Sequence, residues 1–206
     1  MFAIDLLSRL AHGCRFVGGG MRFCWVSWSE QRIKGRTMKD RQKEIKRRLA
    51  RVLELPLREQ AICVFTAAEM SLPDWEGWEN ANRLPPLASE LRRRFQRWLN
   101  GKASDGDLGA SGDELFKVLP EDLTKMENPS AGEAGYALMD VSMIALDKCE
   151  EVHEDILCTA IFYAAAAATN TRKPAISISR ENLTTVECDF LDRWWTLCCQ
   201  QVPMLT

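Results

Sequence analysis

Apolar side chains recur every three or four positions along much of this chain, with charged side chains between them. This pattern is typical of amphipathic α-helices. It predicts such helices over residues 39–54, 57–70, 85–100 and about 183–200. Pro and Gly residues near several of these boundaries fit the starts and ends of helices. We therefore expect a protein built mainly from helices.

Two further stretches are rich in alanine and differ in how much of the helix surface is apolar. Residues 131–148 carry apolar side chains at helical spacing, whereas residues 153–169 are apolar nearly all round. A helix of the second kind belongs in the middle of a bundle, and it is too short to cross a membrane. With short helices expected at 113–118 and from Pro120, the fold class is all-α. We predict a single bundle or orthogonal array of six to seven helices with a central alanine-rich helix.

Residues rich in Pro, Gly, Ser and Asp separate these helices. Residues 71–86 contain Pro73, Gly77 and the pair Pro85 and Pro86, and residues 102–112 are rich in Gly, Ser and Asp. Such residues usually interrupt regular structure, so both stretches are predicted to be loops, the first with room for a short turn of helix.

The first 38 residues differ from the rest because they show no sustained periodicity. They contain Gly18, Gly19 and Gly20, and a strongly periodic helix begins just after Met38, which is a possible start residue. We expect residues 1–38 to be a poorly ordered or non-native extension and residues 39–206 to form one all-helical domain.

Charge is unevenly distributed along the 206 residues. Residues 1–51 contain 13 Lys and Arg against 4 Asp and Glu, a net charge of +9, whereas residues 52–206 carry a net charge of −11. The basic segment could bind a polyanion, or it could lie against its own acidic body. We favour the second interpretation, or a simple solvated helix face.

Eight cysteines are present, but none has the spacing of a metal site. The chain shows no CxxC pair and no secretory signal, and Cys63 and Cys158 lie inside apolar helical runs. These features favour reduced, buried thiols in a cytoplasmic protein, with no metal and no cofactor.

One stretch has the composition of a protein-binding surface. It combines two tryptophans with three acidic residues and comprises Asp74, Trp75, Glu76, Trp78 and Glu79. If exposed, such a surface suits a basic protein partner. Alternatively, the tryptophans fold back and cover the end of the bundle.

An enzymatic function would need a carboxylate cluster, because the usual catalytic sequence motifs are missing from this chain. Asp140 and Asp147 lie seven residues apart on one helical face, and Glu151 and His153 follow. Paired carboxylates can act in acid–base catalysis, although this face could equally be solvated. Glu150 and Glu154 beside His153 could also suggest a metal site, but acids at a helix start are better explained by the helix dipole.

Arginine clusters offer another alternative function, binding to a nucleic acid. The arginines concerned are Arg47, Arg48, Arg51, Arg92, Arg93 and Arg94. The cluster of Arg92, Arg93 and Arg94 with Arg97 lacks interleaved exposed aromatic residues and a recognised motif, so we favour a solvated face there. The acidic remainder of the chain also counts against nucleic acid, which we do not expect as a partner.

The order of features between residues 56 and 170 resembles the Imm5-type family of immunity proteins from bacterial polymorphic toxin systems. The matching features are AICVFTAAE at residues 61–69, the tryptophan-bearing stretch 73–78, the WLNG step at 98–101, and the alanine-rich stretches within 131–168. The residues before Pro85 and Pro86 depart from that pattern, as do Met139 and Met143.

This resemblance implies an all-helical, non-enzymatic cytoplasmic protein that binds and neutralises a cognate toxin. It implies inhibition by steric occlusion with electrostatic steering, in which the acidic body meets a basic toxin surface. No catalytic residue, cofactor or membrane contact is expected.

Overall fold

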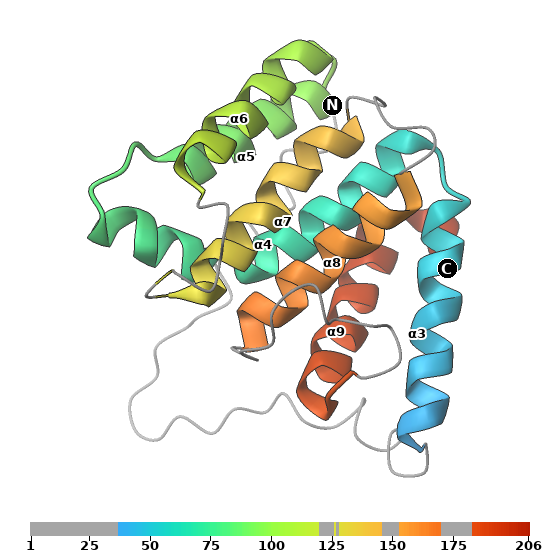
Figure 1. Ribbon diagram of the computed structural model, residues 1–206. Helices are drawn as coiled ribbons and strands as arrows, with labels where there is room; N and C mark the ends of the chain where they lie inside the picture. Colours follow the sequence, from blue (N-terminus) through green and yellow to red (C-terminus); the bar gives the residue numbers. More distant parts are fainter. Residues whose placement is uncertain (1–36, 120–125, 127, 146–152, 170–182) are drawn as a thin grey trace, which may run out of the picture. The chain divides into compact units, whose positions relative to one another are not determined.

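Seven α-helices and one short 3₁₀ helix, with no β-strand, make up the part of the chain that the structure describes (Figure 1). This structure is a computed structural model that describes residues 37–119, 126, 128–145, 153–169 and 183–206, all within one unit, Thr37–Thr206. The α-helices are α3 (Met38–Leu53), α4 (Leu57–Ala81), α5 (Leu87–Leu99), α6 (Asp105–Val118), α7 (Pro129–Ala145), α8 (His153–Thr169) and α9 (Thr185–Gln201), followed by η3 (Pro203–Leu205). The predicted all-α fold of six to seven helices is confirmed. Residues 1–36, which are most of the predicted extension, and the helix expected from Pro120 lie outside the described residues.

Helices α4, α7 and α8 pack against one another in the middle of the fold (Figure 1). Helix α7 also packs against α6, and α6 packs against α5; α4 and α8 both contact α9, which contacts α3. Alanines let the central helices approach closely: Ala134 and Ala137 of α7 and Ala160 and Ala164 of α8 are buried. The alanine-rich α8 lies among α4, α7 and α9, in agreement with its apolar surface.

Local hydrogen bonds at the first turn define where three of the helices begin. In α3, α6 and α9 the N-cap side chain accepts from the third residue's N–H, while that third residue's carboxylate accepts from the N-cap N–H. The pairs are Thr37 with Asp40, Ser104 with Asp107, and Thr184 with Glu187. Each reciprocal pair satisfies donors that a helix end otherwise leaves without a partner.

The predicted loop over residues 71–86 is wrong for most of its length, because α4 continues through Pro73 to Ala81. A proline inside a helix removes one backbone hydrogen bond and crowds the preceding turn. Here Pro73 is exposed, whereas Leu72 and Trp75 on either side of it are buried in the core. Burial of these two side chains offsets the local penalty, so tertiary packing overrides the proline signal.

The predicted loop over residues 102–112 is also wrong from Asp105 onward, where α6 begins. One of its glycines serves close packing: a Cβ on Gly112 would collide with the side chain of Ser142 on α7. Glycine is required at such a position because the neighbouring helix occupies the space that a side chain would fill. The predicted short helix at 113–118 is thus the second half of a longer one.

Candidate functional site

The C-terminal third of α4 carries the five residues predicted to bind a protein. Trp75 is fully buried, and its Nε1 donates a hydrogen bond of 2.9 Å to Oε1 of Glu79. The same Glu79 oxygen accepts from the backbone N–H groups of Leu87 and Ala88, at 2.7 and 3.2 Å. Glu79 therefore anchors Trp75 and satisfies the first turn of α5, which is a structural role.

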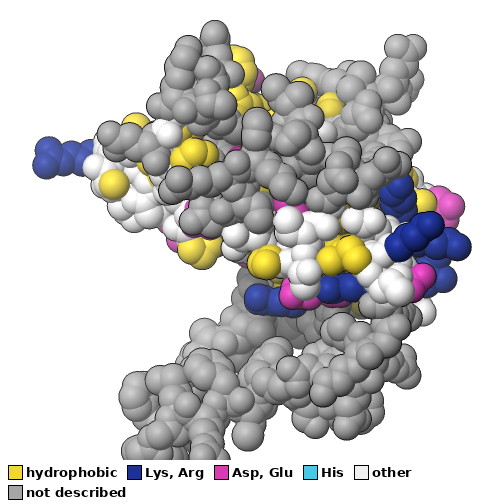
Figure 2. All heavy atoms as spheres, turned by 60° about the horizontal axis from the view of Figure 1, so that its bottom comes forward, with side chains coloured by type: hydrophobic (Ala, Val, Ile, Leu, Met, Phe, Trp, Pro, Cys, Tyr) yellow, Lys and Arg dark blue, Asp and Glu magenta, His cyan; other side chains and the backbone are white. Residues whose placement is uncertain are grey.

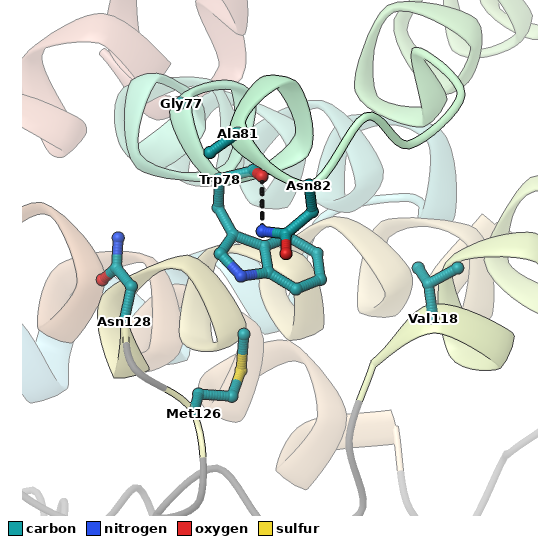
Figure 3. A pocket seen from close by; sticks show the side chains of 7 residues that line it. All are labelled: Gly77, Trp78, Ala81, Asn82, Val118, Met126 and Asn128. Carbon is teal, nitrogen blue, oxygen red and sulfur yellow. Dashed lines mark hydrogen bonds between the residues drawn. The ribbon is translucent and has the colours of Figure 1, made fainter.

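Trp78 lies one turn from Trp75 and is only partly buried. Its ring lies at 5.0 Å from the Trp75 ring, centroid to centroid, and its other side borders a hollow of about 590 Å³. This Trp78 hollow is lined by Gly77, Trp78, Ala81, Asn82, Val118, Met126 and Asn128. Figure 3 shows the indole reaching from α4 toward Met126, with Val118 and Asn128 on either side. The hollow combines apolar carbon and sulfur atoms with two side-chain amides.

The shape of the hollow depends on how α4 ends. The Asn82 side chain donates to the backbone oxygen of Trp78 at 2.9 Å, which holds the last turn closed (Figure 3). Arg83 then adopts φ 54°, the left-handed conformation that commonly ends a helix. Glycine usually occupies such a position. The chain turns away there, and the exposed Ala81 and Asn82 are left at the edge of the hollow.

The acidic residues beside Trp78 differ in their partners. Asp74 precedes Trp78 by one helical turn, is partly buried, and has no hydrogen bond or ion pair with any residue that the structure describes. Burial raises the pKa of the Asp74 carboxyl. Glu76 instead lies 3.9 Å from Arg92 of α5. Asp74, one turn before Trp78, is thus an acidic group that no described residue pairs with.

The predicted binding set therefore divides into two groups. Trp75 and Glu79 are buried, so an exposed role for them is wrong, and the tryptophan does cover the end of the helical core as the alternative interpretation held. Asp74, Glu76 and Trp78 remain accessible in part. Helical continuation through residue 81 causes this division, because it turns positions 75 and 79 inward on one face, while Trp78 lines the hollow and Asp74, one turn before it, stays partly exposed.

Two arginines of α3 form ion pairs with acidic residues of α9. Arg41 bonds to Asp189 and to Asp192 at 2.7 Å each, and Arg48 also bonds to Asp192. On the face shown in Figure 2, Lys and Arg side chains lie beside Asp and Glu side chains. Arg51 lies over the Trp195 ring at 5.6 Å. Part of the basic segment thus lies against the protein's own acidic body, as the favoured interpretation of the charge pattern expects.

The second arginine cluster, on α5, is also paired within the chain. Arg92 bonds to Glu69 at 2.6 Å, and both Arg93 and Arg94 bond to Glu90. These bonds hold the pKa of Glu90 down to about 2. A phosphate would have to compete with carboxylates that already occupy these guanidinium groups.

A different group of polar side chains lies between α7 and α8. Glu133, Tyr136 and Asp140 follow one another at spacings of three and four along α7, so they share one face. The Tyr136 ring stacks on Tyr163 of α8, with ring centroids 5.5 Å apart and planes 23° apart. Glu133 and Asp140 are 4% and 8% exposed. We call these four residues the α7–α8 seam.

The two carboxyls of the seam are buried without compensation. Neither forms a hydrogen bond or an ion pair with any side chain or backbone group in the described residues. Burial raises the pKa of Asp140 to about 7, and burial together with the nearby Glu187 raises that of Glu133 to about 7. Burial, followed by the charges of Asp140 and Glu133, also raises the pKa of Tyr163. The seam therefore favours any species that brings positive charge.

Sequence reasoning placed Asp140 among the candidate acids but favoured a solvated face for it, which is wrong. Asp147 and Glu151 lie outside the described residues, as does the side chain of His153, so their grouping with Asp140 stays a prediction. Glu133, Tyr136 and Tyr163 were missed. One signal could have revealed Glu133: it and Asp140 are the charged residues within Pro129–Ala145, where alanine and glycine predominate.

Within the described residues, no three His, Cys, Asp or Glu side chains come together in a way that could hold a metal ion. The same part of the chain has no helix with the length and apolar character needed to cross a bilayer. Comparison of the chain with models of protein families, with curated proteins and with solved structures gives no match. The function must therefore be inferred from the geometry of the chain itself.

Proposed function

We propose that this chain is a non-enzymatic, cytoplasmic binding protein that neutralises a cognate bacterial toxin, as an immunity protein does. The observation that carries the proposal is the Trp78 hollow with Asp74 beside it. A partly buried tryptophan at a concave surface has the composition and setting of a binding hot spot. The resemblance of residues 56–170 to Imm5-type immunity proteins supports the same function.

The hollow suggests how a partner would be recognised. Trp78, Val118 and Met126 offer apolar surface to a protruding side chain, and the amides of Asn82 and Asn128 can bond to polar groups of its backbone. Asp74 offers a carboxylate without a partner among the described residues to a lysine or arginine. A basic toxin surface would approach faster because the body of the chain is acidic.

The test uses a bulky residue placed at the mouth of the hollow. Trp78 itself is a poor target because it packs against Trp75, so we choose Ala81→Arg, which adds volume and positive charge at an exposed position. Ala110→Arg on α6 is the matched control, since Ala110 is also an exposed helical alanine but does not line the hollow. The partner is the toxin domain encoded by a reading frame beside this gene.

Each variant is co-expressed with that toxin domain, and complex formation is measured by size-exclusion chromatography. The native chain and Ala110→Arg should restore growth and co-elute with the toxin, and Ala81→Arg should do neither. Asp74→Asn should weaken the complex about tenfold at low salt and less at high salt. Rescue by Ala81→Arg equal to that of the native chain would remove the hollow from the interface. A gene with no toxin-like neighbour would contradict the immunity function.

A further inference from the structure

Asp140 is a nearly buried residue whose carboxyl group has no partner among the described residues. The residue is 8% exposed, and it forms no hydrogen bond or ion pair with any residue in the described part of the chain. Native proteins seldom leave a buried carboxyl in this state, because removing its hydration without a replacement is unfavourable. A bound ligand that supplies the missing partner would explain the arrangement.

A second nearly buried carboxyl group, that of Glu133, lies on the same helix as Asp140. Glu133 lies seven residues earlier on the same face of α7, about 10 Å along the helix axis, and is also nearly buried without a partner in the described residues. The stacked rings of Tyr136 and Tyr163 lie at the level between the two carboxyls. The seam thus has a carboxyl group at each end and two aromatic rings between them.

The seam is not completely closed off from solvent. Among described side chains, atoms that are both sealed from solvent and without a hydrogen bond occur only on Arg41, Arg48 and Ser111. The oxygens of Glu133 and Asp140 are not among these atoms, and Tyr136 and Tyr163 are only partly buried. A ligand can reach the seam from the surface.

The spacing of the two carboxyls and the rings between them favours an organic cation over a metal ion. A single metal ion cannot touch both carboxyls at that separation, and the described residues hold no cluster of three metal-binding side chains. Ammonium groups bond well to carboxylates and are attracted to aromatic faces, and a carbon chain packs against aromatic rings. A flexible chain with an ammonium group at each end matches both carboxyls and the rings between them.

We propose that the α7–α8 seam binds a linear polyamine. One ammonium group lies on Asp140 and another on Glu133, and the carbon chain lies against the stacked tyrosine rings. The complex restores charge balance at both carboxyls, which the described residues do not supply. The site is separate from the Trp78 hollow, so its failure would leave the proposed immunity function untouched.

The test is isothermal titration calorimetry of the full chain with spermidine at low salt and about pH 8, where both carboxyls are ionised. One-to-one binding is expected. Asp140→Asn and Glu133→Gln should each weaken it at least roughly tenfold, the effect of losing one charged hydrogen bond. Asp113→Asn, which alters an exposed acid on α6, is the matched control and should bind like the native chain.

A second measurement needs no substitution and so does not depend on the folding of a variant. Ethylenediamine is too short to span the two carboxyls, so it should bind the native chain at least roughly tenfold more weakly than spermidine. Equal affinity for the two amines would overturn the proposal, as would equal loss in Asp113→Asn and Asp140→Asn. Binding of a lysine-containing peptide that depends on Asp140, without binding of spermidine, would also overturn it and assign the seam to a protein partner.

Discussion

The end of α4 and the α7–α8 seam each bury a carboxyl group, but the two carboxyls differ in the hydrogen bonds that they accept. Glu79 is 4% exposed and accepts three hydrogen bonds, from one indole and two backbone N–H groups. Asp140 is 8% exposed and accepts none from the described residues. Burial alone therefore does not tell what an acidic residue does.

The difference lies in which donors the fold brings to each carboxyl. Glu79 lies where a new helix begins, and the first turn of α5 presents backbone N–H groups without partners inside that helix. Asp140 lies in the middle of α7, where backbone donors are used within the helix itself. A carboxyl at a helix start can be structural, whereas one at mid-helix needs a partner from elsewhere.

The largest effect is expected from Glu79→Ala. Removing this carboxyl leaves the buried Trp75 indole and two helix-start N–H groups without their acceptor, so the free energy of unfolding should fall by about 3–5 kcal/mol. Glu79→Gln should lose less because its amide oxygen can still accept. Urea denaturation measures both.

Glu76→Ala is the control for this change, since it removes an acid on the same helix that is only loosely paired with Arg92. It should change the free energy of unfolding by no more than about 0.5 kcal/mol. An equal loss of unfolding free energy in Glu76→Ala and Glu79→Ala would show that the hydrogen bonds of Glu79 do not stabilise the fold.

The second effect, from Asp140→Asn, should be of the opposite sign and depend on pH. At about pH 8 the native chain must keep a buried carboxylate ionised, and asparagine removes that charge. The variant should therefore be more stable by about 3–4 kcal/mol at that pH and nearly unchanged only below about pH 4. Urea denaturation across this pH range gives the two curves.

The sign follows from the raised pKa of Asp140. With a pKa of about 7 in the folded chain against an ordinary value of 3.8, the folded state keeps a proton that the unfolded chain has lost between these values. Native stability should thus fall as pH rises from about 4 to about 7 and level off above. Glu133 adds to this slope, whereas Glu90, with its pKa lowered to about 2, acts at more acidic pH. A native stability that rises over this range would contradict the burial of these acids.

A smaller effect is expected where the two regions meet, at Gly135 of α7. A Cβ there would lie 2.5 Å from Trp75 and 2.6 Å from Leu119, and Trp75 is held by its bond to Glu79. Gly135→Ala should therefore lower the free energy of unfolding by about 2 kcal/mol.

Gly77→Ala is the matched helical control, because a Cβ at that position meets nothing within 4 Å. It should raise stability by about 0.5–1 kcal/mol, since alanine favours the helix more than glycine does. The same loss at both positions in thermal denaturation would mean that the close approach of Trp75 to α7 is not a constraint.

Helical periodicity was enough to predict α3, α5, α8 and α9 to within a few residues. The side chains that share one face of a helix are only three or four residues apart in the sequence, so their apolar pattern can be recognised locally. The same logic failed at Pro73 and in the glycine-rich start of α6. Proline and glycine usually interrupt helices, but here contacts with other helices outweigh their local preference. Those contacts are far apart in sequence and leave no local signal.

The candidate sites also combine features that the local sequence predicts with features that only contacts between helices establish. From the sequence alone, the protein was determined to be all-helical, with an acidic body and a group of tryptophans and acids at residues 74–79, since composition and spacing are local properties. Only the tertiary structure decided that Trp75 and Glu79 lie inside while Trp78 borders a hollow, and that Asp140 is buried beside Tyr163. The physical reason is that burial and hydrogen-bond satisfaction depend on which surfaces of different helices meet, and helices separated by many residues come together only in the folded chain.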